Sequence, residues 1–265
     1  MNDISANFSG EIPKNYERYL GDFIFEPFAI NLAGRAIAHQ PVNVLELACG
    51  TGRLTNHLLK DLPRDGVLTA TDINPAMLAV AQEKVLGANI YWETVDISSL
   101  PYEDEQFDLV ICQFGLMFVP DRENSLRGIK RVLKKKGKLL FSAWGRLSDN
   151  PAWKINNSVL ESYLNSSILT GPFSMADEKA VLSILAKVGF SYADVDEVKL
   201  IGESKTASDA AKGFLMGLPV YSVVTNKNPE LLYPIWDALS EALAQNLGDN
   251  PLRTTLTAWV FEAIN

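Results

Sequence analysis

A glycine-containing segment and an aspartate downstream of it have the residue types and spacing to hold a polar ligand. Gly50, Thr51 and Gly52 follow an apolar run at residues 42–48 and precede leucines at helical spacing. Glycine allows a sharp turn close to a ligand, and the amides that open the next helix attract anions and hydroxyl groups. Asp72 ends the next apolar run, where its carboxylate can accept hydrogen bonds from both hydroxyls of a ribose. The pattern predicts a nucleotide-binding site.

Two cofactor classes and one structural interpretation compete for this segment. Dinucleotide-binding loops carry a third glycine three residues after the second, whereas this chain has Thr55 there. Glu46 instead precedes the glycines in the order acid-x-x-x-Gly-x-Gly. The structural interpretation is a tight turn followed by an aspartate, Asp72, that caps a helix. The absent third glycine counts against NAD as the ligand.

The segment from Glu46 to Gly52 resembles motif I of class I S-adenosylmethionine-dependent methyltransferases, with Ala48 where many members have glycine. The resemblance extends over most of the chain, in the order of the family's motifs. The N-terminal arm is similar to those of a subgroup akin to ubiquinone and menaquinone methyltransferases. The further matching segments are residues 72–77, 96–97, 107–121, 126–144, the arm at 16–29, and a tail after 250 that matches the reversed last strand.

The resemblance implies which residues contact S-adenosylmethionine and its product, S-adenosylhomocysteine. The motif I loop and Asp72 hold the nucleoside, the residues after Asp72 and the pair at 96–97 border the adenine, and the end of the fourth strand lines the methionine end. Two arm tyrosines are assigned to a lid, although core aromatic residues of a helix explain them equally well. The implied residues are Tyr16, Tyr19, Glu46, Ala48, Gly50, Thr51, Gly52, Asp72, Ile73, Asn74, Met77, Asp96, Ile97, Gln113 and Phe114.

The apolar pattern between residues 42 and 144 alternates between strands and helices. Repeated strand–helix–strand units predict a parallel sheet with helices on both faces and ligands at the carboxyl ends of the strands. Asn74 and Asp121 are expected to cap helices, the second of which ends at Gly137 with lysines 134–136 in its last turn. With the resemblance, the expected class is α/β: a Rossmann-like, seven-stranded, mostly parallel sheet with a reversed last strand. Strands are expected at residues 42–48, 67–72, 90–95, 107–114, 139–144, 192–200 and 254–263.

The chain is expected to form one methyltransferase domain with an N-terminal helical arm and an inserted helical cap. Ser174 and Asp177 are expected to open a core helix as a capping box. The expected parts are the arm at 1–40, the cofactor-binding core at 41–144, cap insertions at 145–175 and 203–250, and the remaining core at 176–202 and 251–265.

The expected reaction is direct in-line displacement of the methyl group onto a small molecule. The cofactor carries the reactivity, so the protein need only position the reactants and exclude water, without a metal or a covalent intermediate. The sequence names no general base: His39 lies ahead of the first strand and His57 on the first core helix. Aromatic and apolar cap residues favour an apolar or aromatic acceptor, although ordinary packing also explains them. These residues are Trp153, Phe173, Phe214, Leu215, Met216, Leu218 and Tyr221.

Two other functions remain open, an NAD-dependent oxidoreductase and a non-catalytic S-adenosylmethionine-binding module. The formal charge of −8 counts against nucleic acid as a partner. No apolar run reaches the roughly 18 residues of a membrane span, and the N-terminus lacks a signal peptide, so we expect a cytoplasmic protein. Cys49 and Cys112 are then expected to be buried free thiols. The oligomeric state stays open between monomer and homodimer.

Overall fold

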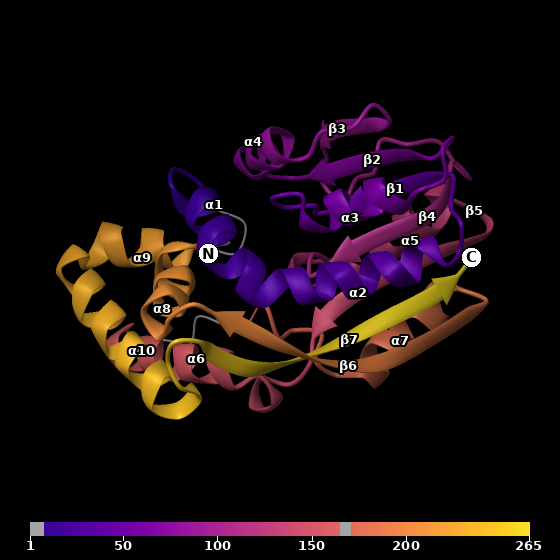
Figure 1. Ribbon diagram of the computed structural model, residues 1–265. Coiled ribbons are helices and arrows are strands. Elements are labelled where there is room, and N and C mark those ends of the chain that lie inside the picture. Colours follow the sequence, from indigo (N-terminus) through magenta and orange to yellow (C-terminus); the bar gives the residue numbers. More distant parts are fainter. Residues whose placement is uncertain (1–7, 165–170) are drawn as a thin grey trace.

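Seven strands form one sheet, in the order β3-β2-β1-β4-β5-β7-β6 (Figure 1). The computed structural model describes residues 8–164 and 171–265. The first five strands in this order (β3, β2, β1, β4 and β5) pair in parallel. β7 runs antiparallel to both of its neighbours, β5 and β6, which confirms the predicted reversed last strand. The strands are β1 (Asn43–Leu47), β2 (Val67–Asp72), β3 (Ile90–Thr94), β4 (Phe107–Gln113), β5 (Leu133–Trp144), β6 (Tyr192–Ser204) and β7 (Leu252–Ile264).

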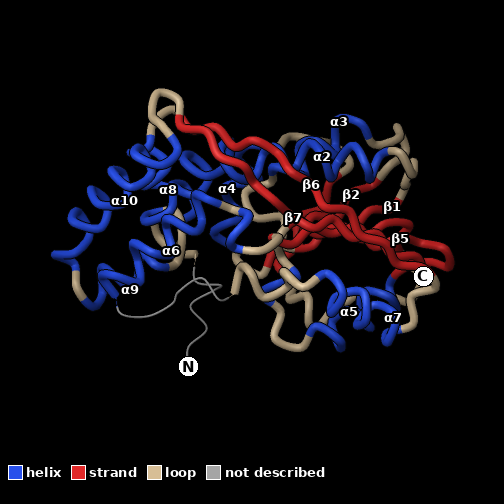
Figure 2. The backbone as a smooth tube through the Cα atoms, turned by 90° about the horizontal axis from the view of Figure 1, so that it is seen from below, coloured by secondary structure: helices blue, strands red, loops and turns tan. Residues whose placement is uncertain are grey.

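Helices cover both faces of the sheet, as Figure 2 shows. α2 (Glu26–Ile37) and α3 (Arg53–Asp61) lie on one face, and α5 (Arg122–Val132) and α7 (Glu178–Val188) lie on the other. α4 (Pro75–Lys84) connects β2 to β3 and packs on both strands. The chain therefore builds outward from β1 in one direction and from β4 in the other, as in doubly wound sheets.

Polar side chains fix the starts of three core helices. Asn74 accepts hydrogen bonds from the amides of Ala76 and Met77, and Asp121 accepts one from Asn124, so both predicted caps are confirmed. The capping box predicted with Ser174 is wrong: Asp177 alone caps α7, through the amides of residues 179 and 180. The Ser174 hydroxyl instead donates to the carbonyl of residue 117.

The predicted helix end at Gly137 is also wrong. α5 ends at Val132, and Leu133 already pairs with Phe107 as the first residue of β5. Leu133 is fully buried, so pairing with β4 keeps its apolar side chain in the core. The lysines at 134–136 consequently lie within β5, at the register shift between Leu133 and Lys138, and Lys134 Nζ forms an ion pair with Asp108 at 2.8 Å.

The N-terminal arm runs from the cap to the sheet (Figure 1). It comprises α1 (Ile12–Asn15), a π-helix η2 (Tyr16–Phe25) and α2. Leu20 and Ile24 of η2 are fully buried. A Cβ atom on Gly202 of β6 would lie 2.4 Å from the Phe23 carbonyl oxygen, so the arm contacts the sheet closely at this point.

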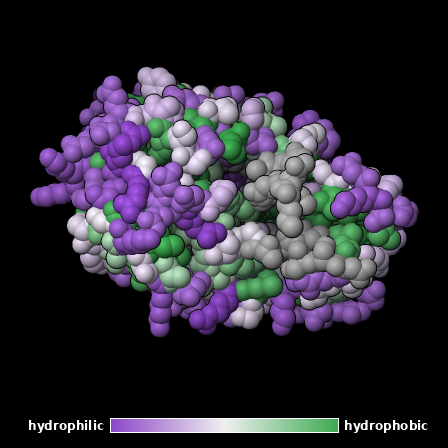
Figure 3. All heavy atoms as spheres, turned by 180° about the vertical axis from the view of Figure 1, so that it is seen from behind, coloured by the Kyte–Doolittle hydropathy of each residue, from purple (hydrophilic) through white to green (hydrophobic). Residues whose placement is uncertain are grey.

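Four helices form the cap, beyond the edge of the sheet where the parallel strands end (Figure 1). The side chains of Phe214, Leu239 and Leu243 in this cap belong to the same hydrophobic cluster as the buried strand residues. Among the described residues, no helix is both long enough and apolar enough to cross a bilayer. In the view from behind, hydrophobic side chains gather toward the cap, while hydrophilic ones cover most of the rest (Figure 3). The cap helices are α6 (Pro151–Leu164), α8 (Ala207–Met216), α9 (Val220–Lys227) and α10 (Leu232–Leu247).

Candidate functional site

The strand order reverses between β1 and β4, and the backbone is unusual where both strands end. Ala48 and Phe114 directly follow β1 and β4, and both have left-handed φ angles, 52° and 55°. A Cβ atom on Gly115 would lie 2.5 Å from the Cβ of Ala48, so the two loops touch. Left-handed conformations of non-glycine residues are costly and concentrate at binding sites. Ligands of doubly wound sheets bind at this reversal point.

The loop after β1 adopts the conformation that its glycines permit. Gly50 and Gly52 have φ angles of 56° and 79°. A Cβ atom on Gly52 would lie 3.0 Å from the Cβ of Ala81, so the glycine also allows the loop before α3 to approach α4 closely. Any other residue at 52 would combine backbone strain with this close contact. The amides at the start of α3 are thereby held beside the ends of β1 and β2.

Asp72 connects this loop to the end of β2. Its Oδ2 accepts a hydrogen bond from the Gly50 amide, and its Oδ1 accepts one from the Asn74 amide, both at 2.8 Å. Burial raises the pKa of the Asp72 carboxyl, and the two amide hydrogen bonds oppose the rise. A carboxylate can accept about four hydrogen bonds. Each Asp72 oxygen can therefore accept a second one, such as a hydroxyl of a ribose.

Glu46 lies under the same loop and has no partner for its charge. Its side chain is 1% exposed, and neither carboxyl oxygen has a hydrogen-bond partner among the described residues. Thr55 Oγ1 is likewise buried and without a partner in the described part of the chain. Burial raises the pKa of Glu46 to about 8; the neighbouring Thr55 opposes this rise, and the nearby Asp72 charge contributes to it. A buried carboxyl of this kind is suited to a cationic ligand group such as an ammonium.

An apolar and hydroxyl-rich rim follows the ends of β2 and β3. Ile73 is 52% exposed directly after Asp72. Met77 faces the loop, with its Cε 3.6 Å from a Cβ built on Gly50. Asp96 Oδ1 accepts hydrogen bonds from the amide and the hydroxyl of Ser98, at 2.8 and 2.6 Å, and Ile97 packs against the core. An exposed apolar side chain beside a polar strand end suits a flat heterocycle.

The arm reaches the ends of β4 and β5. Gln113 Nε2 donates a hydrogen bond to the Phe25 carbonyl at 3.0 Å. The ring of Tyr16 stacks on Phe25 with centroids 4.7 Å apart, and Phe114 stacks on Trp144 at 4.1 Å. Burial raises the pKa of the Tyr16 hydroxyl above its usual range. These contacts join Tyr16 to Phe25, whose carbonyl Gln113 contacts at the end of β4, and the role of Tyr16 as a lid stays a prediction.

Tyr19, the second predicted lid residue, contacts the cap helix α8. Its ring packs at the junction of the arm and the cap, with Lys212 Nζ 5.0 Å from the ring centroid. A Cβ atom on Gly213 of α8 would lie 3.0 Å from the Tyr19 Cβ. Tyr19 therefore joins the arm to the cap in this structure, and its contact with a cofactor stays a prediction.

Sequence reasoning missed an ionic cluster that ties the arm to the loop. Glu17 Oε2 accepts a hydrogen bond from Thr51 Oγ1 at 2.6 Å. Arg53 forms ion pairs with Glu17, Asp22 and Glu26 at distances of 2.6–2.9 Å, and Lys84 also pairs with Glu17. The available signal was an arginine directly after Gly52 and acidic residues along the arm. We call Arg53 and its three carboxylate partners the arm latch.

Neither histidine is an evident general base. His57 Nε2 lies 2.8 Å from Glu26 Oε1, on the outside of the arm latch. His39 precedes β1, at the opposite end of that strand from the glycine loop, and its ring lies beside Lys138 and Glu262. The catalytic assignment therefore stays open, as the sequence left it.

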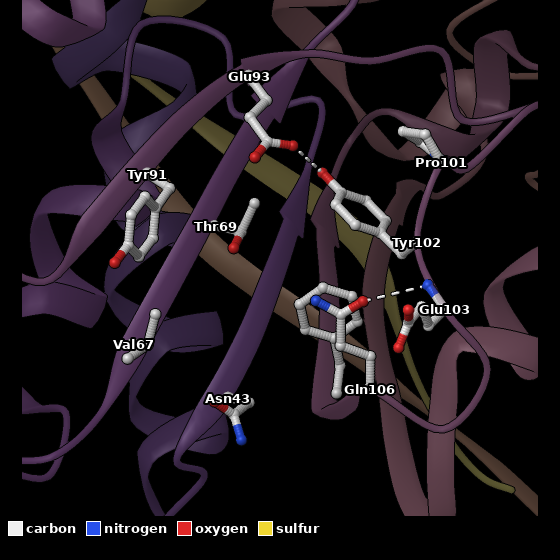
Figure 4. Close-up of a pocket in the computed structure, with 10 residues that line it drawn as sticks. Asn43, Val67, Thr69, Tyr91, Glu93, Pro101, Tyr102, Glu103 and Gln106 are labelled. Carbon is white, nitrogen blue, oxygen red and sulfur yellow. Dashed lines mark hydrogen bonds between the residues drawn. The ribbon is translucent and has the colours of Figure 1, made fainter.

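A large cavity lies away from this site. It is a groove of about 650 Å³ over the beginnings of β1, β2 and β4 and the face of β3. Figure 4 shows its lining, in which Tyr102 donates a hydrogen bond to Glu93 at 2.7 Å. No helix connects β3 to β4, which leaves this part of the sheet open. The loop and acid geometry, rather than cavity size, identifies the carboxyl edge as the candidate site.

Comparisons with known proteins find similar methyltransferases. Residues 44–137 match the family model described as a methyltransferase domain. The chain is 38% identical over 125 residues to a ubiquinone/menaquinone biosynthesis C-methyltransferase UbiE of Shewanella sediminis, a match covering 44% of this chain and 47% of the relative. A UbiE of Pseudomonas aeruginosa is 29% identical over 211 residues, 72% of this chain and 75% of the relative. Over the more similar matches, the chain spans about half the length of the relatives.

Solved structures share the fold at low sequence identity. The cyclase SpnF aligns with a TM-score of 0.58 at 17% identity, covering 91% of this chain and 80% of its own. Phosphoethanolamine N-methyltransferase 2 of Haemonchus contortus, solved with S-adenosyl-L-methionine, aligns with a TM-score of 0.56 at 17% identity and covers 96% of this chain and 56% of its own. These likenesses confirm the predicted Rossmann-like fold class.

Proposed function

We propose that the protein transfers the methyl group of S-adenosylmethionine to a small molecule, because residues 44–137 match the family model described as a methyltransferase domain and the fold is Rossmann-like. The observation that carries the proposal is the pairing of Asp72 with the glycine loop above the unpartnered Glu46 carboxyl. This arrangement offers separate places for a ribose and for the ammonium group of an amino acid. S-adenosylmethionine contains both groups.

The residues at the carboxyl edge fit the cofactor part by part. Asp72 would accept the ribose hydroxyls, and Glu46 would face the ammonium group. The adenine would lie along the rim formed by Ile73, Met77 and the pair at 96–97. Gln113 would hold the methionine end, because its Oε1 is buried and without a partner among the described residues. The position of Thr55, with its buried side chain where a dinucleotide loop has glycine, supports this cofactor over NAD.

The cofactor would supply a methyl group bonded to a sulfonium, and the protein would supply position and shielding. In the transfer, the bond from methyl carbon to sulfur breaks as a bond to the acceptor atom forms. The sulfur becomes a neutral thioether, and the acceptor releases its proton to solvent. Tyr16 and Phe25, held by the arm latch, would exclude water from the reacting atoms.

We propose a neutral aromatic or apolar acceptor. The relatives' names refer to ubiquinone and menaquinone biosynthesis, and the aromatic residues around Trp144 and Trp153 provide flat surfaces for a ring. A cytoplasmic location is proposed with it, supported by the two cysteines, which are buried and unpaired as in a reducing compartment. We also propose the division of the domain into arm, core and cap. The oligomeric state stays open between monomer and homodimer.

Calorimetry with S-adenosylhomocysteine and with NAD tests the cofactor. We expect binding of the first and none of the second, and the reverse result would favour an oxidoreductase. Labelled S-adenosylmethionine, incubated with neutral phenols and naphthalenediols, tests the reaction. Cofactor binding without label transfer to any acceptor would favour a non-catalytic binding module.

A further inference from the structure

Buried polar atoms without partners gather at the junction of the sheet and the cap. Gln113 Oε1, Ser142 Oγ and Trp153 Nε1 have no hydrogen-bond partner among the described residues. Both side-chain amide atoms of Asn156 are also without a partner there. Most buried polar atoms in proteins are hydrogen-bonded, so a group of exceptions requires an explanation.

Three of these residues adjoin one aromatic cluster. Gln113 and Ser142 are register partners on β4 and β5, so their side chains point to the same face of the sheet. Trp144 follows Ser142 by two residues and belongs to that face. The Trp144 ring lies 5.7 Å from Trp153, which in turn lies 4.9 Å from Phe214 of α8. Trp153 of the cap therefore reaches the ends of the strands that border the candidate site.

Asn156 lies one helical turn beyond Trp153 on α6. The buried residues of this helix are Ala152, Trp153, Asn156 and Leu160, which places Asn156 near the centre of the buried face. Its side chain is 0% exposed. Leu160 belongs to the separate cluster between the cap helices, whereas Trp153 belongs to the main core. The Asn156 amide thus lies between two apolar clusters.

The chemistry of the unpartnered atoms specifies a ligand. Gln113 Oε1 is assigned above to the methionine end of the cofactor, which leaves Trp153 Nε1, able only to donate a hydrogen bond, and the Asn156 amide, able to donate and to accept. All of these groups are uncharged, which favours a neutral ligand. The surrounding rings favour a flat one. A ring compound with an oxygen or nitrogen substituent would satisfy atoms that the protein leaves unpaired.

We propose that Trp153 and Asn156 of α6 bind the methyl acceptor, and that the acceptor is a neutral planar ring compound with at least one hydrogen-bonding substituent. This proposal rests on the proposed function, since it places the acceptor beside the same carboxyl edge. The cap then determines acceptor specificity, and the core determines cofactor binding.

Calorimetric titration with 1-naphthol and with naphthalene, in the presence of S-adenosylhomocysteine, tests the proposal. The intact protein is expected to bind 1-naphthol about tenfold more tightly than naphthalene, the effect of one or two hydrogen bonds. Asn156→Leu and Trp153→Phe keep the side-chain volume or the ring while removing the polar atoms. In both variants, the affinities for 1-naphthol and naphthalene are expected to become similar. The affinity for S-adenosylhomocysteine is expected to stay unchanged.

Asn157→Leu is the matched control, because Asn157 neighbours Asn156 on α6 but is only half-buried. It should retain the tenfold preference. Equal binding of the two probes by the intact protein, binding of neither, or a preference that survives in both Asn156→Leu and Trp153→Phe would overturn the proposal. Failure to bind S-adenosylhomocysteine would instead overturn the proposed function, and the two naphthalene titrations, repeated without it, would still test the cap residues.

Discussion

Asp72 holds the glycine loop and also presents free acceptor sites to a ligand. Removing its carboxylate by Asp72→Ala should weaken S-adenosylhomocysteine binding by about 1.5–3 kcal/mol, the scale of charge-assisted hydrogen bonds. Asp65→Ala is the control, because Asp65 is an exposed acid before the opposite end of β2. Calorimetry measures both variants. An unchanged affinity in folded Asp72→Ala would remove Asp72 from the site.

Glu46 makes the stability of the ligand-free protein depend on pH. Burial raises its pKa from an ordinary 4.5 to about 8, so between these values the folded protein retains a proton that the unfolded chain has lost. The protonated Glu46 therefore contributes to the free energy of unfolding. This contribution is fully present below pH 4.5, the ordinary pKa, and is lost as the pH rises through about 8. Glu46→Gln cannot ionise.

The free energy of unfolding of Glu46→Gln, relative to the natural protein, should therefore rise between about pH 4.5 and pH 8 and stay constant above that range. Urea titrations at several pH values measure it. The same variant should bind S-adenosylhomocysteine more weakly, since it has lost the charge opposite the ammonium group. A stability difference that is independent of pH would contradict the assignment of a raised pKa to Glu46.

Single residues also mark how far sequence reasoning reaches in the site. Glu46, Asp72 and the two glycines were predicted because loop chemistry is local, with each residue placed by its own strand end. Glu17 could not be predicted, because its contact with Thr51 depends on how the π-helical arm folds back over 34 residues of chain. The unpartnered Asn156 was missed for the same reason, since nothing in the order of residues shows what surrounds a cap side chain.

At the scale of elements, the arm latch determines how firmly η2 and α2 cover the site. Arg53 is 12% exposed between carboxylates from the arm, so Arg53→Met removes the cation that these acids share and leaves Glu17 with Lys84 and Glu26 with His57. The loss of stability should be about 2–3 kcal/mol, between the values for exposed and buried pairs. S-adenosylhomocysteine should also dissociate faster, which stopped-flow fluorescence can follow.

Arg127→Met provides the matched control for the latch. Arg127 pairs with Glu123 one turn away on the exposed side of α5, and its loss should change stability by about 0.5 kcal/mol or less. Added salt should accelerate dissociation from the natural protein more than from Arg53→Met, because it screens the latch. Equal dissociation rates in the natural protein and Arg53→Met would show that the arm does not restrict release.

The elements themselves were predicted where apolar periodicity and caps agree. β1, β2 and β4 match their expected ranges closely, and Asn74 and Asp121 cap as expected. The helix before β5 was extended too far, because Leu133 fits a helical face and a buried strand equally well. Only the strand that pairs with Leu133 distinguishes a helix from a strand here. The apolar pattern of the sequence does not show which strand that is.

For the whole molecule, the sheet and the cap share one hydrophobic cluster, so they should unfold together. Urea transitions followed by tryptophan fluorescence and by far-UV circular dichroism are expected to coincide. Trp236→Phe removes a reporter in α10, so the difference in fluorescence between the natural protein and this variant reports on that helix of the cap. A cap transition at lower urea than the sheet transition would show that the two parts are independently stable.

The position of β7 has a consequence for biosynthesis. β7 follows every other strand in the sequence, yet it lies between β5 and β6. While a ribosome is still making residues 252–264, β6 has no neighbour to complete its ladder, and one edge of β5 is exposed. Nascent chains with such unpaired edges are prone to aggregate. This protein should therefore depend on chaperones that shield β5 and β6 until β7 inserts between them.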